Sequence, residues 1–286
     1  EHEAGRASEH GGVYLDISWR SGEEVKKKLP GMYHQFKELA AVDITKTPME
    51  VGPTAHYVMG GVKVDSESQE STIQGLYAAG EAATGLHGAN RLGGNSLTDL
   101  LVFGKIAGES AAKRATESEG FVDIDEAEIA DVIAETLAPF DREGGENPAK
   151  VVEDLREMMQ EKVGIIRNGS LLEEALSDLE ELEARAALTS PGGSRIYNPG
   201  WHQALELSAM LDVSRMCALA ALQREESRGG HTRDDFPVPD HKHWGKINSV
   251  IAQEADGSMS IEHRTYPPID DELKALLDAE DLHEEG

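Results

Sequence analysis

The sequence predicts a protein of mixed α+β and α/β class, and three observations point to that class. A short apolar segment at residues 76–79 is followed by a glycine-rich loop and by an apolar helix that begins near Ser96. Helical periodicity then dominates residues 129–226. Residues 247–264 have the pattern of two short strands. A chain of 286 residues can bury a sizeable core, in one large domain or in two to three smaller parts.

Composition narrows the class of protein further. The chain has 39% apolar and 28% charged residues, as globular proteins do. No apolar run approaches the roughly 20 residues that a membrane-spanning helix needs. Cys217 is the only cysteine, which excludes an internal disulfide and fits a reducing cytoplasm. Because Cys217 lies in an apolar helical segment, we expect it to be an inert core residue.

The charge of the chain is strongly one-sided. A net charge of −27 argues against nucleic-acid binding, because phosphate backbones require a basic surface. Two explanations stay open: an ordinary, well-solvated acidic surface, and adaptation to a cytoplasm with multimolar salt. Since the acidic residues are spread along the chain, a property of the whole surface fits better than a single acidic tail.

In chain order, the first part of the sequence predicts short strands and helices. The expected elements are a strand at 11–17, helices at 21–29 and 33–41, a strand at 56–64 broken by two glycines, a polar turn at 65–72 and a buried strand at 76–79. Pro30 ends the first helix, because proline cannot continue a helical hydrogen-bond ladder. The next helix, at 96–114, has a wide apolar face.

The middle of the chain predicts an antiparallel bundle of about four helices. Apolar periodicity marks these helices around 129–137, at 151–166, from Ser170 onward and at 201–226. Ser170 and Glu173 form the capping-box pattern of a helix start. Asn168-Gly169 is typical of the stop of the preceding helix. After the bundle we expect a glycine hinge at Gly229-Gly230 and an acidic terminal helix from Asp270.

The predicted strand, loop and helix start at residues 75–97 favour a cradle for a cofactor. Glu81 follows the strand, so its carboxylate would lie at the edge of a sheet and accept hydrogen bonds from sugar-type hydroxyls. The alternative for Glu81 is a helix cap or an exposed charge. The helix start at Ser96 offers free backbone N–H groups and the positive end of a dipole, which stabilise negative charge. Plain capping by Ser96 is compatible with that role.

Candidate substrate ligands stand beside glycines. Thr54, His56 and His87 lie near glycine residues, which let a small molecule approach the backbone. Arg91 has no acidic neighbour in sequence, so its guanidinium is available to bind a carboxylate with two parallel hydrogen bonds. A lone arginine in a loop is usually just solvated. The loop at 87–94, however, is too rich in glycine to be explained by packing, which favours a functional role.

No metal site is expected. His231, His241 and His243 cluster in sequence but lack cysteines and the spacing of metal ligands, so a surface loop is the better interpretation. The G-x-G-x-x-G fingerprint of dinucleotide-binding folds is absent from these residues. The cradle therefore has no first half that would hold an ADP group.

Three stretches of the chain carry a specific resemblance. They are Pro53-Thr54-Ala55-His56-Tyr57-Val58-Met59-Gly60-Gly61, then Gly75-Leu76-Tyr77-Ala78-Ala79-Gly80-Glu81 with His87-Gly88-Ala89-Asn90-Arg91-Leu92-Gly93-Gly94-Asn95-Ser96-Leu97, and Ser227-Arg228-Gly229-Gly230-His231-Thr232-Arg233-Asp234-Asp235-Phe236-Pro237. Together they resemble the flavoprotein subunit of succinate dehydrogenase and fumarate reductase, over nearly the whole chain.

The resemblance implies an architecture with four parts. Residues 1–53 would be the end of a capping domain, and residues 54–115 the second lobe of an FAD-binding domain. Residues 116–228 would form the helical bundle domain, and residues 229–286 a small C-terminal domain.

The resemblance also implies roles for single residues. His56 and Arg91 match the substrate-carboxylate ligands of the family. Glu81 matches the contact to the ribityl chain of FAD, and Ser96 and Leu97 match the FAD contacts at the helix start. The implied reaction interconverts succinate and fumarate by hydride transfer to or from the flavin. Electrons would pass to an iron–sulfur subunit, then to quinone, with membrane anchor subunits contacted indirectly, at the inner face of the cell membrane.

The chain departs from the family pattern in two places. The N-terminal FAD lobe and the proton-transferring arginine of the capping domain have no match, and neither Arg6 nor Arg20 fits that arginine's motif. We therefore expect the C-terminal half of a split or truncated protein that is inactive alone and carries no catalytic residue itself. Two alternatives stay open: a relative of L-aspartate oxidase, and a non-catalytic remnant that docks an iron–sulfur subunit.

Overall fold

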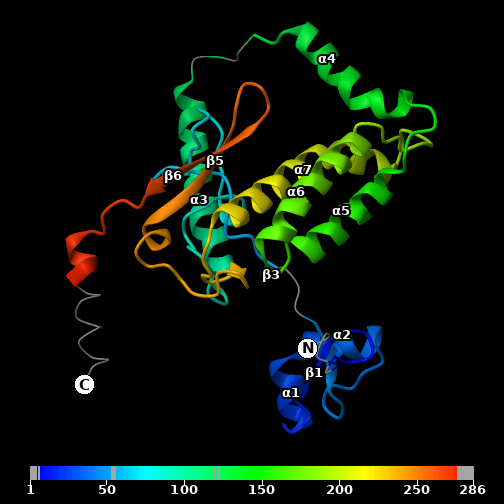
Figure 1. The fold of residues 1–286 in the computed structure, drawn as a ribbon, viewed down its shortest axis with the longest axis vertical. Helices are drawn as coiled ribbons and strands as arrows, with labels where there is room; N and C mark the ends of the chain where they lie inside the picture. Colours follow the sequence, from blue (N-terminus) through cyan, green and yellow to red (C-terminus); the bar gives the residue numbers. More distant parts are fainter. Residues whose placement is uncertain (1–4, 6, 53–55, 119, 121–122, 276–286) are drawn as a thin grey trace. The chain divides into compact units, whose positions relative to one another are not determined.

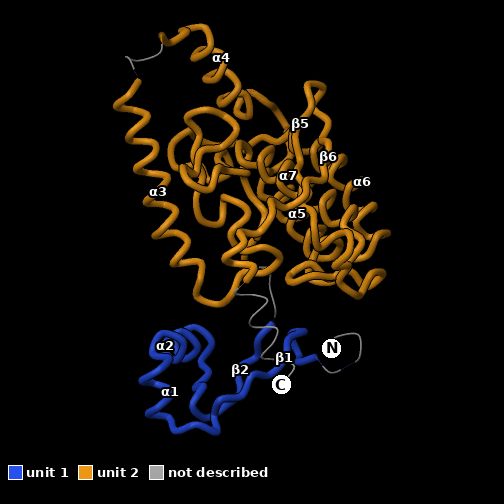
Figure 2. The backbone as a smooth tube through the Cα atoms, turned by 90° about the vertical axis from the view of Figure 1, so that its left-hand side faces the viewer, with its two compact units in different colours: residues 1–56 blue, residues 57–286 orange. Residues whose placement is uncertain are grey.

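The structure is a computed structural model that describes residues 5, 7–52, 56–118, 120 and 123–275. The chain divides into two compact units, residues 1–56 and residues 57–286 (Figure 1, Figure 2). Helices and short strands are mixed in both units, which confirms the predicted fold class. The four-part domain division stays a prediction.

The first unit is a small layer of helices on a two-stranded ribbon. Strand β1 (Val13–Leu15) pairs antiparallel with β2 (Met49–Val51). Helix α1 (Gly22–Lys28) begins at Ser21, whose side chain accepts a hydrogen bond from the backbone N–H of Glu24. Helix α2 (Pro30–Leu39) starts with its proline in the first turn, where no N–H is missed. The core of this unit centres on Val25, Ile44 and Met49.

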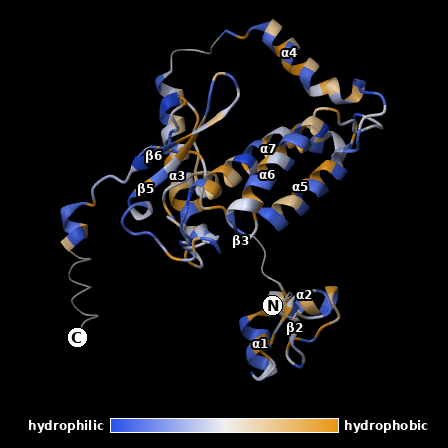
Figure 3. Ribbon diagram, in the orientation of Figure 1, coloured by the Kyte–Doolittle hydropathy of each residue, from blue (hydrophilic) through white to orange (hydrophobic). Residues whose placement is uncertain are grey.

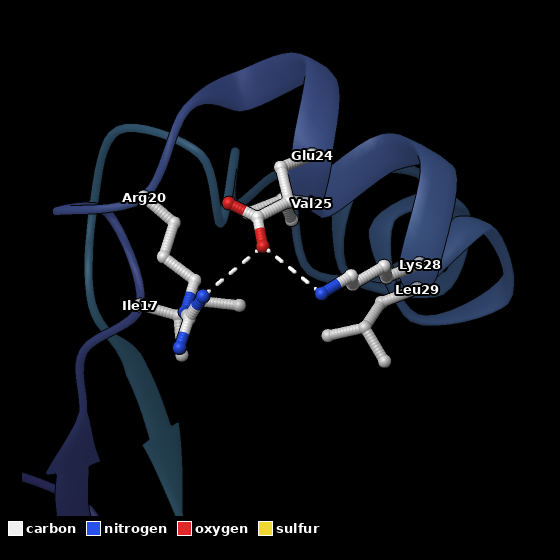
Figure 4. Close-up of a pocket in the computed structure, with 6 residues that line it drawn as sticks. All are labelled: Ile17, Arg20, Glu24, Val25, Lys28 and Leu29. Carbon is white, nitrogen blue, oxygen red and sulfur yellow. Dashed lines mark hydrogen bonds and ion pairs between the residues drawn. The ribbon is translucent and has the colours of Figure 1, made fainter.

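A small cavity opens between α1 and the segment before it (Figure 4). Ile17, Val25 and Leu29 supply its apolar wall. Glu24 lies between Arg20 and Lys28 and bonds both, at 3.0 and 3.1 Å. Both cations therefore share the single carboxylate of Glu24.

The predicted strands at 56–64 and 76–79 are wrong as strands. Among the described residues they form isolated bridges only: Val62 with Ala83, Val64 with Ser71, and Glu70 with Tyr77. A ladder needs successive residue pairs, and the glycines here break the succession. Gly61 lets the two segments approach closely, because a Cβ there would lie 2.5 Å from the carbonyl oxygen of Ala82. Residues 76–79 are also less buried than predicted, with Leu76 47% exposed.

Helix α3 (Asn95–Glu117) follows the glycine-rich loop and starts one residue before the predicted position. Its N-cap is Gly94 in the left-handed conformation, with φ of 86° and no side-chain cap. The short 3-10 helix η1 (Gly80–Ala82) packs against it. Gly80 has a φ of +70°, which favours glycine, and a Cβ there would lie 2.5 Å from the side-chain end of Leu100.

The bundle consists of α5 (Pro148–Lys162), α6 (Gly169–Ala186) and α7 (Pro199–Gln223), which lie side by side in Figure 1. Its core is apolar and fully closed, with Val151, Leu172 and Leu179 at 0% exposure. Helix α4 (Glu126–Leu137) was predicted as a bundle member but stands apart, and none of its residues is buried. Figure 3 shows apolar residues along α4 as along the bundle, so periodicity alone could not separate them.

Helix α4 is tied to the bundle at its C-terminal end. The 3-10 helix η2 (Ala138–Asp141) continues α4 and contacts α7. The indole N–H of Trp201 donates to the carbonyl of Thr136 at 2.8 Å. The Phe140 ring packs against the Trp201 ring at 5.4 Å between centroids.

Asparagines start the bundle helices. The side chains of Asn147, Asn168 and Asn198 accept hydrogen bonds from the first-turn N–H groups of α5, α6 and α7. The predicted start of α6 at Ser170 is therefore wrong, because Asn168 caps that helix. Asn168 belongs to the next helix and not to the stop of α5, which ends at Lys162.

Short strands complete the second unit. Strand β3 (Ile166–Arg167) pairs parallel with β4 (Thr232–Arg233). Strands β5 (Ile247–Gln253) and β6 (Met259–Thr265) form an antiparallel hairpin, as predicted, after the 3-10 helix η3 (Trp244–Lys246). A helical turn at 271–275 matches the predicted terminal helix as far as the structure describes it. Within the described residues, no helix is both long and apolar enough to cross a membrane.

Candidate functional site

The glycine-rich loop leads into the first turn of α3 without a side-chain cap, and the backbone N–H of Asn95 donates to the carbonyl of Leu92 at 3.2 Å. The first N–H groups of a helix have no partner inside the helix. Here Gly94 supplies no side chain to cap them, and its positive φ is a conformation that glycine adopts without strain. Ser96 is therefore inside the helix and is not its cap. The start of α3 presents N–H groups and the positive end of the helix dipole at the loop.

Asp99 is the buried centre of this region. Its side chain is 5% exposed, although it lies on a helix surrounded by leucines. One oxygen, Oδ2, lies 3.0 Å from Nε2 of His87 and accepts a hydrogen bond from the Tyr57 hydroxyl at 3.3 Å. The rings of Tyr57 and His87 meet edge to face, 5.5 Å apart. Asp99 thus joins α3, the loop and the segment after His56.

Tyr57 acts in this cluster as a neutral donor. Burial, followed by the negative charge and hydrogen bond of Asp99, raises the pKa of Tyr57. The phenol therefore stays protonated and donates to Asp99. Donation toward a carboxylate fixes the plane of the ring, which is the surface on which Arg91 rests.

Arg91 lies over the face of Tyr57, with its guanidinium carbon 4.6 Å from the ring centroid. This is the geometry of a cation–π contact. One terminal nitrogen donates to the carbonyl of Leu92 at 3.2 Å. The Nε atom is buried and has no hydrogen-bond partner among the described residues. A buried donor without a partner is costly.

Glu81 lies on η1 beside the same region. One carboxylate oxygen, Oε1, accepts a hydrogen bond from the backbone N–H of Val58 at 2.9 Å. The side chain is exposed, and the other oxygen can accept from a ligand. Glu81 lies in a 3-10 turn instead of at the end of a strand. It is therefore close to the glycine-rich loop, as predicted, although the predicted sheet is not formed.

The structure brings together most of the predicted site residues. Arg91, Glu81, Ser96 and Leu97 lie in the second unit, in the loop, on η1 and on the first turn of α3. Leu97 is 67% exposed. His56 is exposed and is the last residue of the first unit. Its role as a substrate ligand beside Arg91 therefore stays a prediction. Thr54 lies outside the described residues.

Sequence reasoning gave no role to Tyr57 or Asp99. The available signal was an aspartate among the leucines of a helix with an apolar face, since a carboxylate is buried only when it is paired. Its partners could not be read from the sequence, because Tyr57 lies far from it in the chain.

The three histidines of the C-terminal segment do not share one environment. His241 and His243 are exposed, as a surface loop predicts. His231 turns inward and accepts a hydrogen bond at Nδ1 from Arg167, 3.0 Å away. Its Nε2 lies 3.0 Å from the carbonyl of Arg224. Among the described residues, no group of three His, Cys, Asp or Glu side chains is arranged to hold a metal ion.

Comparison with known proteins settles the family. The model of the fumarate reductase flavoprotein C-terminal region matches residues 152–274, and the FAD-binding domain model matches residues 1–97. The chain belongs to the flavoprotein family of fumarate reductase and succinate dehydrogenase. The resemblance seen in the sequence is thereby confirmed, and so is FAD as the cofactor.

Individual relatives agree. The chain is 36% identical over 265 residues to the fumarate reductase flavoprotein subunit of Escherichia coli, covering 90% of this chain and 44% of that protein. It is 39% identical over 282 residues to the succinate dehydrogenase flavoprotein subunit of Coxiella burnetii, covering 92% and 46%. The solved Mycobacterium smegmatis Sdh1 complex in the apo form matches with 48% identity and a TM-score of 0.81, covering 93% of this chain and 46% of that one. The chain therefore spans less than half the length of these relatives.

Proposed function

We propose that the chain is the substrate- and flavin-contacting half of an enzyme that interconverts succinate and fumarate. The observation that carries this proposal is Arg91, whose buried Nε has no partner among the described residues. Its guanidinium lies over the ring of Tyr57, and Arg91 itself belongs to the glycine-rich loop. Arginine forms two parallel hydrogen bonds to a carboxylate, which suits a dicarboxylate substrate.

Two residues of the chain would bind the substrate. Arg91 binds one carboxylate of the substrate and His56 contributes a second ligand. Holding the dicarboxylate at the Arg91 guanidinium positions the substrate for reaction, and holding reactants in place lowers the barrier. Positive charge on Arg91 also polarises the adjacent C–H or C=C bond. The proton-transferring arginine is expected outside this chain.

The residues present fit FAD. The first turn of α3 has backbone N–H groups that no side chain caps, and the positive end of its dipole suits negative charge on a reduced flavin. Leu97 and Leu101 are 67% and 76% exposed, which gives an apolar surface beside these donors. Ser96 and Leu97 would hold the ring system, and Glu81 the ribityl hydroxyls. When bound, FAD supplies the donor or acceptor of the hydride.

The partners follow from the same proposal. An iron–sulfur subunit would take the electrons that bound FAD supplies and pass them to quinone, and the membrane anchor subunits would be reached through that iron–sulfur protein. The chain is peripheral on the cytoplasmic face of the membrane within such a complex. Absence of a spanning helix among the described residues is compatible with a peripheral location.

The proposal is tested on the complex in which the chain occurs, purified from cells. Fumarate should reoxidise the reduced flavin, and succinate should reduce the oxidised flavin. Butyrate, which has one carboxylate, serves as the matched non-substrate. Equal responses to succinate and butyrate would contradict a role in dicarboxylate chemistry. Flavin reduction by L-aspartate with reoxidation by oxygen would identify the aspartate oxidase alternative instead. Co-purification with an iron–sulfur subunit without flavin would favour the non-catalytic remnant.

A further inference from the structure

The signature segment at 227–237 has no role in the proposed chemistry, yet it touches the loop that carries Arg91. Arg228 and His231 close a tight turn by two backbone hydrogen bonds, of 2.8 and 2.9 Å. At the tip of this turn the N–H of Gly230 donates to the carbonyl of Ala89 at 2.8 Å. Ala89 lies two residues before Arg91. The two glycines predicted as a hinge thus lie in a turn that is closed by its own hydrogen bonds and bonded to a neighbouring loop.

Only glycine fits the turn at its closest point. Gly229 has a φ of +58°, and a Cβ there would lie 2.6 Å from the carbonyl carbon and 2.8 Å from the Cβ of Ala89. These are backbone and Cβ atoms, so the loop itself would have to move. Gly230 is less crowded, since a Cβ would meet the flexible end of Met59 at 3.1 Å.

A buried cluster of charged side chains around Glu226, just before the turn in the sequence, anchors the turn. Glu226 is 0% exposed and accepts hydrogen bonds from the Nε atoms of Arg224 and Arg228, at 3.0 and 2.9 Å. Its other oxygen accepts from the second Arg228 nitrogen at 3.0 Å and from the Asp240 N–H at 2.7 Å. Burial alone would raise the pKa of Glu226, but the hydrogen bonds from Arg228, Asp240 and Arg224 lower it overall, so it stays charged.

His231 adds a second anchor at the other end of the turn. Arg167 donates to its Nδ1 and its Nε2 faces the carbonyl of Arg224, each at 3.0 Å. Arg167 belongs to β3 and Arg224 follows α7, so the turn is fixed to the base of the helical bundle.

We infer that the Arg228–His231 turn is a positioning clamp for Arg91, with Gly229 as the residue that sets its distance from the loop. The inference rests on the proposed dicarboxylate role of Arg91. The clamp holds Ala89 from the bundle side while Asp99 holds Tyr57 and His87 from the α3 side. The guanidinium is thereby aimed before the substrate arrives, which reduces the ordering cost of binding.

The test compares Gly229→Ala with Gly192→Ala in the purified complex. Gly192 also has a φ of +58°, but a Cβ there would meet nothing within 4 Å. Both variants therefore carry the same backbone strain, and only one displaces the loop. We expect G229A to raise the KM for fumarate about tenfold with a smaller change in kcat. G192A should keep the KM within about twofold and lower the thermal midpoint less than G229A, because only G229A adds a clash to the shared backbone strain.

Outcomes separate the clamp from the proposed function. An unchanged KM in G229A overturns the clamp and leaves the function standing. If the wild-type complex does not act on fumarate or succinate, the proposed function is wrong. The clamp is then tested by nitrogen NMR of the Arg91 Nε–H group in the full chain. A shift of that resonance in G229A but not in G192A supports it, and equal spectra overturn it. Should G229A not fold, Gly230→Ala is the milder variant, with a smaller effect expected in the same direction.

Discussion

The helical bundle and the start of α3 use their leucines in opposite ways. In the bundle, Leu172 and Leu179 are 0% exposed and pack against neighbours from the same unit. On α3, Leu97 and Leu101 are 67% and 76% exposed, and Asp99 is the buried residue. The bundle completes its own core, whereas α3 buries a charge and leaves its apolar side available. An exposed apolar surface of this kind is compatible with the flavin site that we propose.

The largest expected effect is on the free energy of unfolding, and it tests the contrast between the bundle and α3. Leu179→Ala should lower the free energy of unfolding by about 2 to 5 kcal/mol, because it opens a cavity in a closed core. Leu101→Ala removes the same atoms from an exposed position and should change it by less than about 0.5 kcal/mol. Denaturant unfolding of both variants measures the difference. Equal losses would mean that α3 is packed as tightly as the bundle.

The next effect concerns function and not stability. Arg91→Lys keeps the charge but removes the two-pronged geometry, so the KM for fumarate should rise by about ten- to a hundredfold. Arg156→Lys, at an exposed position of α5, is the matched control and should leave the kinetics unchanged. Steady-state kinetics of the complex provide the measurement. An R91K enzyme with wild-type KM would remove Arg91 from the substrate site.

A smaller effect separates the two roles of Tyr57. Tyr57→Leu removes the surface on which Arg91 rests and should weaken dicarboxylate binding about tenfold, as the loss of a partly buried cation–π contact implies. Tyr57→Phe keeps the ring and loses only the hydrogen bond to Asp99, so the loss should be about threefold or less. If both variants weaken binding equally, the hydroxyl matters and the ring does not.

The smallest effect is a pH dependence of the clamp. Burial lowers the pKa of His231; the hydrogen bond to the Arg224 carbonyl opposes this, and the charges of Arg167, Arg224 and Arg233 add to it. The neutral ring is therefore favoured in the folded state. Its stabilising contribution is complete above the unfolded pKa of 6.5 and is lost as the pH falls through the lower folded value.

This dependence is measured as the change in thermal midpoint between about pH 7.5 and pH 5. His231→Gln can keep both hydrogen bonds without a titrating group. We expect the stability of H231Q to depend less on pH than that of the wild type. The difference in the free energy of unfolding should be about 1 kcal/mol or less. Parallel curves for the two proteins would show that His231 does not titrate in this range.

Local patterns in the sequence predicted the elements that depend on near neighbours. The helices of the bundle follow from apolar residues repeated every three to four positions, and the β5–β6 hairpin from its alternation. The glycine-rich loop and the arginine within it also stand out in sequence, and with them the family. The predictions failed where an element needs a distant partner. Residues 56–64 and 76–79 have strand-like composition but find only single bridges, and α4 has an apolar stripe but no place in the core.

The sequence by itself determined the class of fold, the bundle helices, the loop that presents Arg91 and the membership of a flavoprotein family. The tertiary structure alone decided that Asp99 joins Tyr57 to His87, and that Gly229 meets Ala89 across the second unit. The physical reason is the range of the forces involved. Helix periodicity and turn chemistry act between residues a few positions apart, so they are written in the local sequence. A hydrogen bond between distant segments depends on how the whole chain closes its core, and no local pattern encodes it.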